Sequence, residues 1–206
     1  MISALHEHGW WLASRASGLV ALGLITVSVA IGLMMAGRIM RKPGRAKTMV
    51  ALHEQTALAG LVAIAVHGVT LLGDAYLHPG IAGIAIPGAI DYRPLWVGLG
   101  IAGGYLAATL GLSFYVRRSI GPRLWRRLHR LTIFVYALSV AHTIGAGTDA
   151  STPLLRWWLL ITAPAILALL AARATEPWRR KRRTAAHRPG LRAPGAPTPA
   201  ASEAAR

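Results

Sequence analysis

The chain has 206 residues, of which 54% are apolar and only 15% charged, and its mean hydropathy is +0.45. This composition is too apolar for an ordinary soluble domain and predicts an all-α, multi-pass helical bundle in the cell membrane. The chain has no cysteine, which excludes disulfides, cysteine-held iron–sulfur clusters and covalent haem attachment. The net charge of +16 does not indicate nucleic-acid binding, because the basic residues are clumped between apolar segments.

Five apolar segments are each expected to form a transmembrane helix, since about 20 apolar residues cross ~30 Å of hydrocarbon. The expected helices span about 16–37, 48–73, 94–116, 124–147 and 153–172. Residues 1–15 read as a short amphipathic lead-in, and the connection 74–93, rich in proline and glycine, predicts an ordered cap or a shallow re-entrant segment. Residues 1–172 then form the transmembrane domain, and the basic, Pro/Ala-rich tail 173–206 is expected to be disordered.

Lysine and arginine are distributed unequally between the two sides of the expected bundle. The loop 38–47 carries five of them, the segment 117–130 six and the tail nine, which is 20 of the 23 in the chain. Cytoplasmic segments of membrane proteins are enriched in these residues. We therefore predict that the N-terminus lies outside and the C-terminus in the cytoplasm.

Two of the expected helices carry a matched pattern of histidines. The motif Leu-His-x-x-Thr contains His53 in the second helix and His129 in the fourth, and further histidines follow at His67 and His142. Both helices start at the cytoplasmic side, so His53 and His129 share an inner depth. The second histidines lie ~21 Å and ~20 Å further out. The four side chains therefore form an inner and an outer pair.

Imidazoles inside a bilayer are costly and usually face a partner within the bundle. Two imidazoles from facing helices can satisfy a haem iron from its two sides, and small residues between His53 and His67 leave room for a bulky planar group. The alternative is four unrelated polar positions in a bundle. One geometric difficulty concerns the fourth helix, where 13 positions rotate the second histidine ~140° away from the first. The fourth helix must then bend, contain a wide turn or point its two histidines differently, and of these a local π-type turn between them is expected.

These paired histidines, spaced 14 and 13 on alternate helices, resemble the transmembrane domain of the ferric reductase superfamily, which includes the NADPH oxidases and the haem-binding membrane partner of the periplasmic methionine sulfoxide reductase. The resemblance covers about residues 1–172. It implies two haem b groups, one held by His53 and His129 and the other by His67 and His142. It also implies electron transfer from a cytoplasmic reduced flavin or pyridine nucleotide to an outer acceptor. The chain lacks the appended flavin and NADPH domains of larger members, which implies a separate electron donor that supplies the flavin.

Arginines near the two levels are candidates to neutralise haem propionates. Arg126 and Arg130 adjoin His129 at the inner level, with membrane orientation and attraction to anionic lipid as the equal alternative. Arg93, Arg156 and Arg15 lie on the outer side against the positive-inside trend and are candidates for outer propionates. The G-x-G-x-x-G sequence at 98–103 lies inside an apolar segment with no strand before it, so close helix packing explains it better than dinucleotide binding.

The sequence thus predicts a di-haem b-type cytochrome, an oxidoreductase component if it is an enzyme, that needs a cytoplasmic donor and an outer acceptor. One rival is a quinone-linked cytochrome b subunit of a dehydrogenase. The other is a transporter whose histidines bind a non-haem metal or relay protons. Hydrolysis and phosphoryl transfer have no support, because their motifs are absent from the sequence.

Overall fold

The protein is described from a computed structural model, which covers residues 2–37 and 44–186. Over these residues it consists of helices, turns and loops, with no strand. The elements are α1 (Ile2–Ala36), α2 (Arg45–Leu71), α3 (Gly80–Ala85), α4 (Pro94–Leu112), α5 (Arg117–Ile120), α6 (Pro122–His129), α7 (Thr132–Ala146), a 3₁₀ turn η1 (Thr148–Ser151) and α8 (Pro153–Ala186). The all-α prediction is confirmed for this part of the chain.

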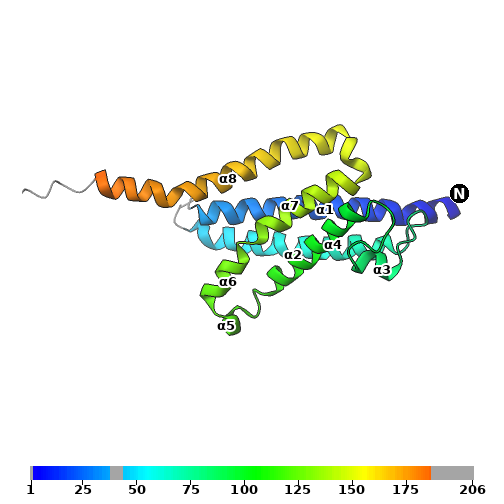
Figure 1. Cartoon of the computed structure of the whole chain (residues 1–206), viewed down its shortest axis with the longest axis horizontal. Coiled ribbons are helices and arrows are strands. Elements are labelled where there is room, and N and C mark those ends of the chain that lie inside the picture. Colours follow the sequence, from blue (N-terminus) through cyan, green and yellow to red (C-terminus); the bar gives the residue numbers. More distant parts are fainter. Residues whose placement is uncertain (1, 38–43, 187–206) are drawn as a thin grey trace, which may run out of the picture.

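Helix α1 is the central element of the bundle. It packs along α2, which runs in the opposite direction, and also contacts α7 and α8 (Figure 1). Helix α4 packs along α7 and contacts α2. Helices α2 and α7 are therefore held mainly through α1 and α4, and over their described residues they do not pack closely against each other.

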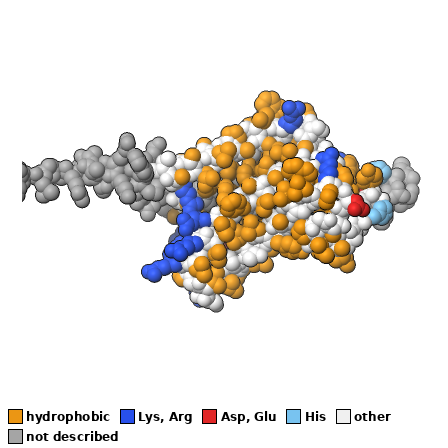
Figure 2. All heavy atoms as spheres, viewed as in Figure 1, with side chains coloured by type: hydrophobic (Ala, Val, Ile, Leu, Met, Phe, Trp, Pro, Cys, Tyr) orange, Lys and Arg blue, Asp and Glu red, His pale blue; other side chains and the backbone are white. Residues whose placement is uncertain are grey.

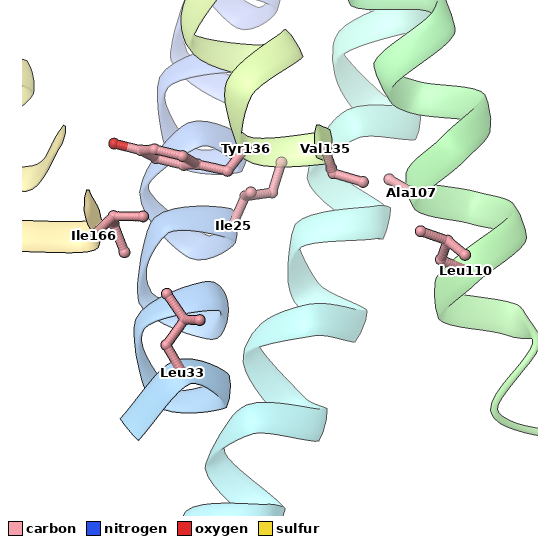
Figure 3. Close-up of a cluster of buried hydrophobic side chains, with 7 residues drawn as sticks. All are labelled: Ile25, Leu33, Ala107, Leu110, Val135, Tyr136 and Ile166. Carbon is pink, nitrogen blue, oxygen red and sulfur yellow. The ribbon is translucent and has the colours of Figure 1, made fainter. Parts of the chain in front are cut away.

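A cluster of buried apolar side chains joins four of the helices (Figure 3). Ile25 of α1 and Tyr136 of α7 are 9% and 6% exposed, and Ile166 of α8 is 2% exposed. The complete cluster is Ile25, Leu33, Ala107, Leu110, Val135, Tyr136 and Ile166. The cluster is apolar except for the Tyr136 hydroxyl, which is buried without a hydrogen-bond partner among the described residues.

Four helices contain segments long and apolar enough to cross a membrane. These segments are His8–Ala36, Arg45–Leu71, Pro94–Leu112 and Pro153–Thr175. The lead-in expected before residue 16 is not a separate element, because α1 is continuous from Ile2. Helix α8 continues 14 residues beyond its expected end at 172, since arginine and lysine end an apolar segment but remain good helix formers. The tail 187–206 and residues 38–43 of the first basic loop lie outside the described residues.

The fourth expected helix, 124–147, is divided into α6 and α7. Arg130 and Leu131 lie between them as turn residues, and α7 with its 15 residues is ~22 Å long, short of ~30 Å. The expected π-type turn is wrong. Leu131 N donates to Leu128 O at 2.8 Å and Phe134 N donates to Leu131 O at 2.9 Å, which are i→i+3 bonds. Such tight turns add rotation between the two histidines, whereas a π turn would remove it.

Polar and apolar side chains are separated along the long axis (Figure 2). Hydrophobic side chains cover most of the visible body, and many of the visible lysines and arginines gather at the end that holds α5 and α6. Histidine and acidic side chains lie towards the opposite end. The described part of the chain therefore shows the charge separation that the sequence predicts between its two sides.

Candidate functional site

The structure brings the four predicted histidines together as two pairs. His53 of α2 faces His129 at the end of α6, with ring centroids 5.9 Å apart and ring planes at 88°. His67 of α2 faces His142 of α7, with centroids 6.2 Å apart and planes at 72°. All four side chains are partly buried. The pairs are the ones expected from the depths of the residues in the sequence.

The separation within each pair suits one metal ion between two rings. Metal–imidazole nitrogen bonds are about 2.0 Å long for zinc, and two imidazoles that share one metal from opposite sides have ring centres about 6.3 Å apart. The observed 5.9 and 6.2 Å are close to this distance. The two rings of each pair meet edge to face, whereas Trp125 and His129 are stacked, with centroids 4.9 Å apart and ring planes at 23°.

Three of the histidines are oriented by backbone carbonyl groups. The Nδ1 atom of His53 lies 2.9 Å from Ser28 O, that of His67 lies 2.8 Å from Ser14 O, and that of His142 lies 2.9 Å from Trp96 O. A carbonyl oxygen only accepts, so each Nδ1 carries the proton and donates. The Nε2 atom of each ring keeps a free lone pair. Metal-bound histidines are typically oriented in this way, with the second nitrogen donating to a carbonyl or carboxylate.

Helix α1 presents the same short motif to both histidines of α2. Ser14 and Gly18 contact His67, and Ser28 and Gly32 contact His53. A Cβ atom at Gly18 would lie 3.0 Å from His67 Nδ1, and one at Gly32 would lie 3.2 Å from His53 Cε1, so both glycines let the rings approach α1. The two Ser-x-x-x-Gly motifs are 14 residues apart, the spacing of the histidines themselves. Sequence reasoning missed these residues, and this shared period is the signal that could have found them.

His142 is held by α4 in a similar way. Its ring lies against Gly100, where a Cβ atom would come within 2.4 Å of Nδ1, and its Nδ1 donates to Trp96 O one turn earlier. Gly104 instead faces Ile64 of α2 at an ordinary contact distance of 3.5 Å. The G-x-G-x-x-G sequence therefore lies inside a helix and serves close packing, as predicted, and Gly100 has the additional role of seating His142.

His129 differs from the other three histidines. Its Nδ1 is buried without a hydrogen-bond partner, and its ring stacks on Trp125 of the same helix at 4.9 Å with an interplanar angle of 23°. The Nε1 atom of Trp125 is also buried without a partner. The inner pair therefore has one ring held by a hydrogen bond and one held by stacking.

The predicted arginines lie at the two levels in different settings. Arg126 and Arg130 flank His129 and are exposed. Arg93 is the N-cap of α4, and its Nη1 donates to Gly145 O at 2.6 Å, three residues after His142. Arg15 forms a bidentate ion pair with Asp149, with Nε to Oδ2 at 2.9 Å, so its guanidinium group is already matched by a carboxylate.

Each pair supplies two nitrogen ligands, and the described residues contain no group of three or more histidine, cysteine or acidic side chains that could hold a metal ion. Two opposed imidazoles are the axial set of an iron whose other four ligands come from a macrocycle. These residues fit a haem at each level.

Comparison with protein families, with curated proteins and with solved structures finds no match for this chain.

Proposed function

We propose that the protein is a di-haem b-type membrane cytochrome, which transfers electrons from a cytoplasmic donor to an acceptor outside the cell membrane. The observation that carries the proposal is the pair of facing imidazoles at each of two levels, with centroids 5.9 and 6.2 Å apart. Carbonyl acceptors behind three of the four rings support it, because they leave Nε2 free to bind a metal.

The proposed topology has five crossing segments, with α6 and α7 together forming the fourth. It places the N-terminus outside and the C-terminus, with its basic tail, in the cytoplasm. Four apolar helices and the basic end at α5 and α6 support this arrangement. The electron donor is a separate flavin- or NAD(P)H-dependent partner, and the acceptor is a protein or small molecule on the outer face.

The residues of this chain have four tasks in the proposed activity. The four histidines would bind the two irons, and the serine and tryptophan carbonyls of α1 and α4 keep the rings of His53, His67 and His142 in one tautomer and orientation. When bound, each haem supplies a one-electron carrier. The apolar cluster around Ile25 and Tyr136 would exclude water from the middle of the bundle, and Arg126, Arg130 and Arg93 would pair with propionates.

The test is a reduced-minus-oxidised absorption spectrum of the purified full-length protein, together with haem content per chain. We expect a b-type α band and two haems per polypeptide. Replacement of His67 or His142 by alanine should remove one haem and leave the other. A preparation made with haem in excess that shows no such band would refute the cytochrome proposal and favour the transporter alternative. Loss of both haems, or of neither, in both variants would refute the pairing.

A further inference from the structure

We infer that the two histidine pairs give their haems different reduction potentials, with the inner pair the more positive. This inference rests on the proposed function and goes beyond it, because it assigns an order to two sites that the histidine pattern alone makes equivalent. It follows from the hydrogen bonds that the four rings make to the rest of the chain.

The outer pair is the more basic set of ligands. Both of its rings donate from Nδ1 to a carbonyl, His67 to Ser14 O at 2.8 Å and His142 to Trp96 O at 2.9 Å. A ring that donates a hydrogen bond gives more electron density to the metal through its other nitrogen. Ferric iron carries one more positive charge than ferrous iron, so it gains more from a basic ligand. The outer site therefore favours the oxidised state and has the lower potential.

The inner pair has only one such bond. His53 donates to Ser28 O at 2.9 Å, whereas the Nδ1 of His129 is buried without an acceptor. The His129 ring is positioned by stacking on Trp125, which leaves the basicity of its Nε2 unassisted. One inner ligand is therefore weaker than its three counterparts, and the inner site favours the reduced state relative to the outer one.

The fixed charges act in the same direction, although exposure and screening make their effect smaller. Helices α5 and α6 carry five arginines at the inner end, partly offset by Glu54 beside His53. At the outer end, Arg15 is neutralised by Asp149, and the two arginines Arg93 and Arg156 remain. Positive charge disfavours ferric iron, so it raises the potential of the inner site more than that of the outer site.

The order of potentials is tested by redox titration of the haem-loaded full-length protein, monitored at the α band. The wild-type chain should titrate in two one-electron steps. The variant His142→Ala should keep the more positive step, and His53→Ala the more negative one. A single step with two equivalent haems, or the reverse assignment, would overturn the inference while leaving the cytochrome proposal intact. A wild-type chain without haem would refute the proposal itself.

The hydrogen-bond origin is tested by ligand rescue, with His142→Gly and His129→Gly as a matched pair. Each variant is supplied with imidazole, which has an N–H group, or with 1-methylimidazole, which has none. In His142→Gly, imidazole should restore the wild-type potential and 1-methylimidazole should leave it more positive, because Trp96 O receives no hydrogen bond. In His129→Gly, the two ligands should give the same potential. Equal responses in both variants would overturn the hydrogen-bond explanation.

Discussion

Gly100→Ala is the sharpest test of the outer site. The added Cβ would lie 2.4 Å from Nδ1 and 2.7 Å from Cγ of His142, whereas ordinary contact begins at 3.4 Å. The ring must therefore move by about 1 Å, which disturbs its hydrogen bond to Trp96 O and takes its Nε2 out of the position in which it could share a metal with His67. We expect the apoprotein to lose about 1–3 kcal/mol of stability, as for other overpacked sites.

The assay is haem content per chain, with the absorption spectrum as a second measurement. Gly100→Ala should retain one haem and Gly104→Ala two, because a Cβ at Gly104 meets only Ile64 at 3.5 Å. The two substitutions lie one turn apart on α4 and change helix propensity equally. The reasoning is refuted if Gly100→Ala keeps both haems with an unchanged spectrum, or if Gly104→Ala loses as much haem.

Three further predictions concern the inner site, the outer ion pair and the topology. Gly32→Ala should perturb the spectrum of the inner haem and leave the outer one unchanged, because the added Cβ would lie 3.2 Å from Cε1 of His53. A change in the outer haem would contradict this prediction. Asp149→Asn should lower the free energy of unfolding by about 1–2 kcal/mol, because its ion pair with Arg15 is only partly exposed. Reversing both charges, with Arg15→Asp and Asp149→Arg in one chain, should recover part of this loss. An equal loss of stability in the double variant would argue against the ion pair. The chain has no cysteine, so a single cysteine introduced by Tyr76→Cys or Ser119→Cys can be labelled in intact cells. A thiol reagent that does not cross the membrane should modify the cysteine at position 76 and spare the one at position 119. The opposite result would reverse the proposed orientation.

The sequence predicted the bundle and the histidine pairs for a simple physical reason. Apolar segment length predicts which segments can cross a membrane, and the side on which lysine and arginine gather predicts the direction of each crossing. Once the directions are known, residue spacing gives the depth of each histidine at ~1.5 Å per residue. His53 and His129 could therefore be placed at one level without any knowledge of how the helices pack.

The finer geometry could not be obtained in the same way. The acceptors of the histidine rings are backbone carbonyls, which every residue has, so nothing in the side chain of Trp96 identifies it as one. The spacing of 13 residues between His129 and His142 indicated that the helix departs from regular geometry. Both a tight and a wide turn change the rotation between these two residues. Only the i→i+3 hydrogen bond from Leu131 N to Leu128 O shows that the turn is tight. The extension of α8 was missed because a basic sequence that ends an apolar segment was taken to end the helix as well.

The distance between the two histidine levels has an electrical consequence. His53 and His67 are 14 residues apart, ~21 Å along α2, which is about two-thirds of a ~30 Å hydrocarbon layer. A unit charge that crosses the whole layer at 100 mV changes its energy by about 2.3 kcal/mol. In a cell with a negative interior, moving an electron from the inner to the outer level is therefore favoured by about 1.5 kcal/mol. That is roughly tenfold in an equilibrium constant. The inferred order of reduction potentials, with the inner haem the more positive, opposes outward electron transfer, and the membrane voltage would offset this opposition. Outward electron transfer in energised vesicles should therefore slow when the voltage is collapsed.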